Sequence, residues 1–164
     1  MRVLLPATLA SLAAALASGW FEPADGIGYL PGSGEDDDAE EVELLATEAA
    51  AAASLRQLGA AGPEVSARRV VLAADLDDRV EPDVADVARG SDGAPLPVRL
   101  AAPVPISAVA SVLVDPVSRI ALVRAALAGE THDAYEAREQ VEAGPLLWFD
   151  RSEIDVLIQG ETAK

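Results

Sequence analysis

MRVLLPATLASLAAALASG, residues 1–19, is the stretch whose interpretation decides both the fold class and the compartment of the protein. It has the parts of a secretory signal peptide: a basic residue at Arg2, an apolar run from Val3 to Ala17, and an A-x-A cleavage site that ends at Ala17. It also has the parts of a first strand and a first helix. The two interpretations differ in what they require of the pattern.

The apolar residues of this stretch are periodic, which a signal peptide does not require. Four of them recur at the helical spacing i, i+3, i+4 and i+7, namely Leu9, Leu12, Ala13 and Leu16. Thr8 is a typical helix N-cap and Gly19 a typical helix stop. We therefore predict a strand over Arg2–Leu5 and a helix over Thr8–Ser18 that stay in the protein, with cleavage after Ala17 as the alternative.

Composition limits the protein to a globular class. The 164 residues suffice for a single domain, and 51% of them are apolar although only 4% are aromatic. The core is therefore expected to consist of Ala, Val, Leu and Ile. Because cysteine is absent, disulfides, thiolate metal sites and cysteine nucleophiles are excluded.

The net charge of −16 limits the partners. Nucleic acids and anionic membranes bind through Lys and Arg, and no basic residue occurs between Arg2 and Arg56. We therefore expect no nucleic-acid and no membrane partner. A basic partner protein is compatible with this charge, although acidity also serves to keep an alanine-rich surface in solution.

Strands and helices alternate along the chain. We predict one α/β domain over residues 1–164, with a mixed, partly parallel sheet of about four to six strands covered by helices, and irregular acidic loops over 20–40 and 77–96. The long helix that ends at Leu58 is expected to bury a stripe that includes Leu44, and Asp115 is expected to cap a later helix. The expected strands are Arg2–Leu5, Ile27–Leu30, Arg69–Leu76, Pro97–Ala102, Ser111–Val114 and Leu146–Phe149, and the further helices are Asp115–Leu127, Thr131–Ala143 (exposed) and one from Asp150 through Ile158.

Three carboxylates follow the clearest strand and form the candidate ligand or metal site: Asp75, Asp77 and Asp78. In α/β proteins ligands bind at the carboxyl ends of strands, and paired carboxylates there perform acid–base or metal chemistry. A strand end followed by polar loop residues explains the same pattern without a ligand, and this simpler interpretation is favoured. Nearby, the Asp75–Asp86 spacing lacks the glycine of an EF-hand.

Other motifs predict no catalytic residue and no cofactor. Gly26-Ile-Gly28 lacks the third glycine of a dinucleotide fingerprint. The acidic run Glu35–Glu43 matches no metal-site spacing and suits a helix N-terminus. His132 is the single histidine, and its neighbour Asp133 is badly placed to orient it in a Ser-His-Asp device. We therefore expect a binding protein in preference to an enzyme.

Trp148 and Phe149 belong to the densest hydrophobic group of an aromatic-poor chain. Core packing is the favoured role, because large aromatic side chains are mostly buried. The alternative is a partner contact, since a half-exposed tryptophan often anchors an interface.

Several segments resemble, in order, an uncharacterised family of short actinobacterial proteins: MRVLLPATLASLAAAL, RRVVLAADLDD, VRLAAPVPISAVASVLVDP and LLWFDRSEI. Members of that family typically start MRVYLPATL, carry VVVAADV and end near LLWY. Leu4 here replaces the usual tyrosine, and the stretch 26–38 departs from the family pattern. The resemblance implies a cytoplasmic protein whose N-terminus belongs to the fold, and it implies no activity.

Together these observations predict a small, acidic, cytoplasmic protein that acts by binding to another protein, without catalysis. An enzyme or metal-binding protein that uses Asp75, Asp77 and Asp78 is the first alternative. A secreted protein cleaved after Ala17 is the second. The oligomeric state is left open by the sequence.

Overall fold

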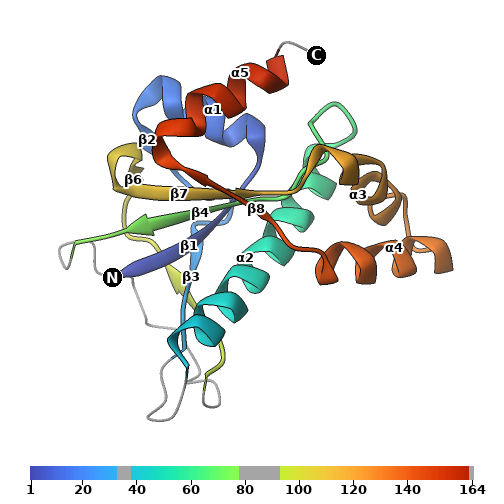
Figure 1. The fold of residues 1–164 in the computed structure, drawn as a ribbon, viewed down its shortest axis with the longest axis horizontal. Coiled ribbons are helices and arrows are strands. Elements are labelled where there is room, and N and C mark those ends of the chain that lie inside the picture. Colours follow the sequence, from blue (N-terminus) through green and yellow to red (C-terminus); the bar gives the residue numbers. More distant parts are fainter. Residues whose placement is uncertain (33–37, 78–92, 163–164) are drawn as a thin grey trace.

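The computed structural model describes residues 1–32, 38–77 and 93–162. A six-stranded sheet has the order β5-β3-β1-β4-β7-β8, and β2 and β6 form a separate two-stranded ladder (Figure 1). The strands are β1 (Arg2–Ala7), β2 (Trp20–Phe21), β3 (Ile27–Leu30), β4 (Val70–Asp75), β5 (Leu96–Arg99), β6 (Val104–Pro105), β7 (Val109–Val114) and β8 (Leu147–Asp150). The helices are α1 (Leu9–Ser18), α2 (Ala39–Ala61), α3 (Ile120–Ala126), α4 (His132–Ala143) and α5 (Ile154–Thr162), with 3-10 turns at Ile106–Ala108, Val117–Arg119 and Arg151–Glu153.

The first residues of the chain form the centre of this sheet. β1 pairs with β4 along its whole length, from Arg2 opposite Asp75 to Ala7 opposite Val70, and with β3 on its other side. The backbone of Met1 also exchanges hydrogen bonds with Leu76, which extends the ladder by one residue. The expected strand is thus present and runs two residues further, to Ala7. β1 pairs with β3 at Leu4, opposite Tyr29, so the missing N–H of Pro6 interrupts no pairing there.

The helix that follows β1 begins and ends where its caps predict. The Thr8 hydroxyl accepts a hydrogen bond from the Ser11 backbone N–H at 3.1 Å, and the Ser11 hydroxyl accepts one from the Thr8 N–H at 2.9 Å. Gly19 ends α1 in the left-handed conformation with φ of 84°. Leu9 and Leu12 are buried against the sheet, so residues 2–18 contribute both a central strand and a core helix.

All strand pairs in the described sheet are antiparallel, so the predicted partly parallel sheet is wrong in this respect. The reason lies in the position of β1. β3 and β4 run in the same direction and are joined by α2, as in a parallel crossover. β1 lies between them, however, and separates the two strands that would otherwise form a parallel pair. The α/β class itself is confirmed.

Helices cover both faces of the sheet (Figure 1). α1 and α5 pack on one face, where Val3, Leu72 and Val112 form the main core. α2 crosses the other face over β1, β3 and β4, where it buries a row of alanines against Leu4 and Val71. Small side chains let this helix approach the sheet closely, which explains a core with few aromatic residues.

The helices α3 and α4 form a hairpin that packs against the second half of α2, around Leu55, Leu58 and Val141. Along α4, Ala134 and Ala137 are buried as well, so the prediction that this helix is exposed is wrong for one of its faces. In α3, Val123 and Ala126 are the buried residues. None of the helices in the described ranges is long and apolar enough to cross a membrane.

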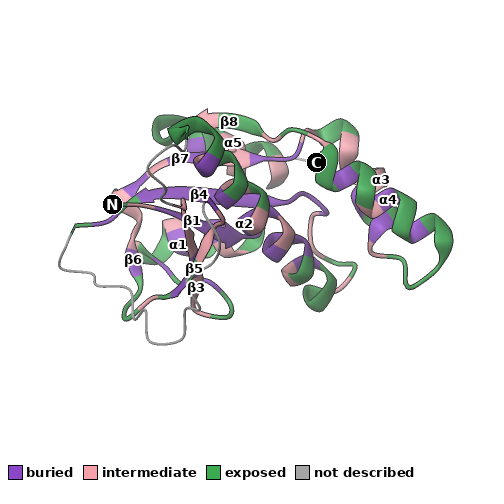
Figure 2. Ribbon diagram, turned by 90° about the horizontal axis from the view of Figure 1, so that it is seen from below, coloured by how far each residue is buried: buried purple, intermediate pink, exposed green. Residues whose placement is uncertain are grey.

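Burial decreases from the centre of the sheet to its β8 edge (Figure 2). Five of the six residues of β1 are buried, whereas no residue of β8 is. Leu44, which was expected in the buried stripe of α2, is 56% exposed. This correction has a geometric cause: α2 crosses the sheet over β1, β3 and β4 and leaves the same face of β7 and β8 uncovered. Of the irregular loop predicted over 77–96, residues 78–92 lie outside the described residues.

Candidate functional site

The predicted acidic site begins at Asp75, and the structure joins this residue to Arg2. The Arg2 guanidinium donates from Nε and Nη2 to the two Asp75 carboxylate oxygens, both at 3.0 Å, and its Nη1 lies 3.5 Å from Glu43 on α2. The hydrogen bond from Arg2 lowers the pKa of Asp75, and the same contact raises the pKa of Arg2. Asp75 is therefore ionised and engaged at neutral pH, which suits a strand-end clasp more than an acid–base catalyst.

The structure does not bring the three predicted carboxylates into one cluster that can be described. Asp77 is exposed and Asp78 lies outside the described residues. Within the described ranges no three His, Asp or Glu side chains are placed to hold a metal ion. The prediction assumed that neighbouring strands have their carboxyl ends side by side at one edge of the sheet. Because β1 and β4 are antiparallel, Asp75 lies instead beside the first residues of β1.

A buried charged network was missed at the other end of β4. Arg69 donates to the Asp115 carboxylate through its backbone N–H, Nε and Nη2, at 2.8–2.9 Å, and both side chains are almost fully buried. Asp115 is therefore an internal ion-pair partner and does not cap the following helix, as was expected. The neighbouring Arg68 donates to the Asp115 backbone carbonyl and forms an ion pair with Glu161 of α5. The sequence signal that could have revealed this network is the pair of arginines, Arg68 and Arg69, directly before an apolar strand.

This network fixes the connection between α4 and β8. The Arg69 Nη2 also contacts the Gly144 carbonyl at 3.3 Å, and the guanidinium of Arg119 occupies the space where a Cβ of residue 144 would lie. Only glycine fits at position 144 without displacing Arg119. The backbone directly before β8 is thereby held against Arg69 and Arg119.

A groove of about 600 Å³ lies between the first half of α2 and the α4–β8 connection. Its walls are mostly apolar and include Leu44, Leu113 and Leu146, and two exposed carboxylates, Glu48 and Glu142, belong to its lining. In the part of the chain that the structure describes, neither carboxylate forms an ion pair. The groove is therefore an apolar channel with a negative rim. The remaining lining residues are Thr47, Ala51, Ala52, Arg69, Ala143, Gly144 and Pro145.

Trp148 continues this surface toward the edge of the sheet. It pairs with Leu113 across β7 and β8, so both side chains lie on the face that α2 leaves uncovered. The Trp148 side chain is 62% exposed, and the expectation that it packs in the core is wrong. Phe149 points to the opposite face, where it packs against the core cluster around Val112, and for this residue the core role is confirmed.

β8 is an edge strand of the sheet, and within the described residues β7 is its principal neighbour. The outer edge of β8 is therefore open to a further strand. The Asp150 N–H bonds to the Glu153 carboxylate at 2.7 Å, away from β7. Because successive residues of a strand alternate in direction, the backbone N–H and C=O of Trp148 also point away from β7. At the opposite edge of the sheet β5 carries Pro97, which blocks such pairing.

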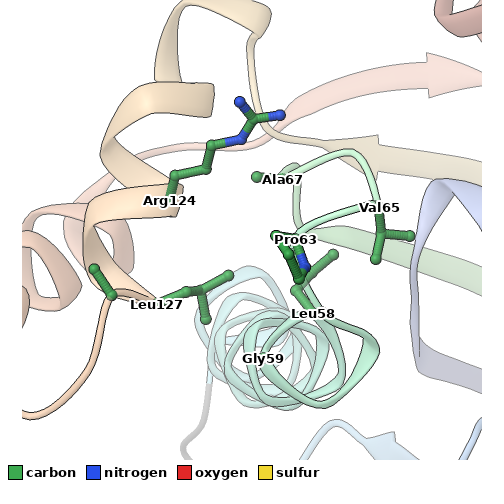
Figure 3. Close-up of a pocket in the computed structure, with 9 residues that line it drawn as sticks. Leu58, Gly59, Pro63, Val65, Ala67, Arg124 and Leu127 are labelled. Atoms are coloured by element: carbon green, nitrogen blue, oxygen red, sulfur yellow. The ribbon is translucent and has the colours of Figure 1, made fainter.

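A second cavity of about 300 Å³ lies at the C-terminal end of α2, between residues 62–67 and α3 (Figure 3). Leu58, Pro63 and Leu127 supply apolar walls, and the guanidinium of Arg124 extends toward Ala67 at one side of the cavity. Composition and periodicity gave no signal for this cavity, because its lining comes from two segments, 58–67 and 124–128, that are distant in the sequence.

Comparisons with known proteins identify a family but no activity. The model of a family described as "Family of unknown function (DUF6912)" matches residues 1–158. No curated protein and no solved structure matches the chain. The predicted resemblance to an uncharacterised family over nearly the whole chain is confirmed by this match.

Proposed function

Because the chain belongs to the DUF6912 family, whose function is unknown, we propose a function from its own surface: it is a non-catalytic module that binds a basic, amphipathic segment of a partner protein. The groove between α2 and β8 is the binding site. The observation that carries the proposal is the combination of exposed apolar side chains with an acidic rim along one uncovered strip of the sheet.

The apolar part of the strip supports binding of a protein segment. Leu44 and Trp148 are each more than half exposed, and Leu113 lies between β8 and α2 at the floor of the groove. An aromatic anchor beside a pocket is the usual composition of an interaction hot spot. The backbone groups at the open edge of β8 add directional hydrogen bonds for an extended partner.

The charge of the strip supports a basic partner. Glu48 and Glu142 lie at the groove, and the whole chain has a net charge of −16. The arginines near the groove do not offset this charge, because Arg69 is buried in its ion pair and Arg119 donates to the Gln140 carbonyl. A partner that places Lys or Arg opposite the rim and apolar side chains in the channel matches both features, and its association is accelerated by electrostatic attraction.

We also propose that the protein acts in the cytoplasm with its first residues attached. Cleavage after Ala17 would remove the central strand β1 and the buried side chains of α1. This support is structural, and the compartment itself is tested by measuring the intact mass of the protein from fractionated native cells. A secreted product that begins at Ser18 would contradict the proposal.

The binding proposal is tested with a synthetic amphipathic peptide of leucine and lysine, and with a counterpart in which glutamate replaces lysine. Trp148 is the reporter in a Trp20→Phe background, because the chain holds two tryptophans. The Leu/Lys peptide is expected to shift the emission of Trp148 to shorter wavelengths as water leaves the indole ring. The Leu/Glu peptide is expected to leave it unchanged.

The double variant Glu48→Gln/Glu142→Gln removes the acidic rim and is expected to weaken binding of the Leu/Lys peptide by about tenfold, since two exposed charge pairs together contribute about 1.4 kcal/mol. The matched control Glu22→Gln/Glu64→Gln changes the net charge equally at residues that do not line the groove. Equal weakening by both double variants would show that only the overall charge matters and would contradict a binding site in the groove.

A further inference from the structure

The cavity at the C-terminal end of α2 has walls that suit a small apolar molecule. Leu58 is 2% exposed and forms its base, while Leu127 and Pro63 flank it from the residues that directly follow α3 and α2 (Figure 3). Its volume of about 300 Å³ lies at the lower end of the range for small-molecule sites. The cavity lies outside the groove to which the proposed function is assigned, and the two share no lining residue.

Arg124 is the charged residue that lines this cavity, and its bonding sets it apart from most arginines of the described chain. Arg124 has no carboxylate or carbonyl partner among the described residues, and its side chain is exposed on α3. The arginines that do donate to a carboxylate or to a backbone carbonyl are Arg2, Arg68, Arg69, Arg99, Arg119, Arg138 and Arg151. Arg124 is therefore a guanidinium available to a ligand.

We propose that this cavity binds a small amphipathic monocarboxylate, with its apolar chain between Leu58 and Leu127 and its carboxylate on Arg124. A guanidinium matches a carboxylate in geometry and can bind it through two parallel hydrogen bonds. The apolar walls supply the remaining affinity and exclude a ligand that is polar throughout.

The surroundings favour a single negative charge over several. α2 ends at Ala61, and the terminal carbonyl groups of a helix carry partial negative charge that opposes an anion. The net charge of −16 opposes it at longer range, although salt at physiological concentration screens charges beyond about 8 Å. One carboxylate in direct contact with Arg124 overcomes this field, whereas each additional charge of a phosphate would meet only repulsion.

The test uses octanoate and 1-octanol, which share an apolar chain and differ in charge. Both are titrated into the whole protein, and binding is followed by the amide signals of residues 58–67 and 120–128 in heteronuclear NMR spectra. Octanoate is expected to shift these signals at lower concentration than 1-octanol. Absence of any octanoate-dependent shift in these two segments would overturn the proposal.

Two substitutions separate the parts of the site. Arg124→Gln is expected to weaken octanoate binding by about tenfold, because a hydrogen bond to a charged group is lost, and to leave 1-octanol binding unchanged. Gly59→Leu is expected to abolish binding of both, because Gly59 lines the cavity and its Cβ would meet Leu127 at 3.5 Å, an ordinary contact that the helix tolerates.

Arg56→Gln is the matched control, since Arg56 is an exposed arginine on α2 that does not line the cavity. Octanoate is expected to bind this variant as it binds the unsubstituted protein. If Arg56→Gln and Arg124→Gln weakened octanoate binding equally, the carboxylate would not be held by Arg124 and the proposal would be wrong.

Discussion

Asp115 and Arg69 form a buried ion pair in which one carboxylate accepts three hydrogen bonds from a single residue, from its backbone N–H and from two guanidinium nitrogens. Arg69 precedes β4 and Asp115 follows β7, so the pair joins the ends of two neighbouring strands. The same guanidinium contacts the Gly144 carbonyl before β8. Three strands of the sheet are thereby fixed at one point.

Removal of one partner of this pair is expected to be strongly destabilising. Asp115→Ala leaves the Arg69 charge buried without a counter-ion, and the free energy of unfolding should fall by about 3–5 kcal/mol. Urea denaturation followed by circular dichroism measures this change. The double variant Arg69→Met/Asp115→Leu should recover much of the loss, because neither charge is then buried. A loss in Asp115→Ala below about 1 kcal/mol would contradict this account.

Ser54 joins α2 to the end of the β1–β4 ladder. Its buried hydroxyl donates to the Ala7 carbonyl at 2.6 Å and accepts from the Val70 N–H at 2.9 Å. Ser54→Ala leaves both backbone groups without this partner and is expected to cost about 1–3 kcal/mol of unfolding free energy. Thr47→Ala is the control, since that hydroxyl bonds only to the Glu43 carbonyl within the same helix. Equal effects of the two variants would contradict the bridging role.

The contact between Arg2 and Asp75 predicts a small dependence of stability on pH. Because the pKa of Asp75 is lowered in the folded protein, its contribution is present above the unfolded pKa of about 3.9 and is lost as pH falls through the folded value. The side chains are 39% and 54% exposed, so solvent screening limits the contribution to about 0.5 kcal/mol. Asp75→Asn should therefore lower stability slightly at pH 7.

The difference in unfolding free energy between Asp75→Asn and the unsubstituted protein should become smaller below about pH 4 and also in high salt. Asp77→Asn, two residues further along at an exposed position, is the control and should show no such difference. The same two variants test the alternative metal site. Calcium or magnesium binding that is lost in Asp75→Asn would support the metal site. If instead the stability difference between Asp75→Asn and the unsubstituted protein did not depend on pH, the proposed role of the Arg2–Asp75 contact would be wrong.

The N-terminal segment predicts that shortening the chain abolishes the fold. A protein that begins at Ser18 lacks β1, which pairs with both β3 and β4. Without it the two remaining halves of the sheet have no common strand, and the apolar groups of Val70 and Leu72 lose their cover. Circular dichroism and thermal unfolding should show no cooperative transition. A cooperative transition in the shortened chain would restore the signal-peptide interpretation.

Local features of the fold were predictable because they depend on neighbouring residues. Thr8 and Gly19 delimit α1 as their capping chemistry requires, and strand β3 has the predicted bounds Ile27–Leu30. The last helix was predicted to start at Asp150, and a capping box between Asp150 and Glu153 is present there, although it begins a 3-10 turn that leads into α5. In each case the controlling interaction spans about four residues, which a sequence pattern displays directly.

The features that were not predicted depend on distant residues. The sequence does not show that β1 lies between β3 and β4, and this insertion turned an expected parallel pair into two antiparallel ones. Asp115 has the surroundings of a helix cap, but the backbone and side chain of Arg69 compete for its carboxylate. Leu44 follows the helical period, yet it lies on the side of α2 that faces the groove beside the uncovered strands, where it is 56% exposed. The groove results from these placements and has no motif of its own.

The position of β1 also governs how the chain can fold as it is made. Arg2 is translated 73 residues before its partner Asp75, an interval of roughly 4–15 s at synthesis rates of about 5–20 residues per second. During that interval β1 can pair only with β3, because β4 has not yet been made, and its other edge remains open to chaperones at the ribosome. Nascent-chain stability should therefore rise abruptly once β4 has emerged, and not gradually with length.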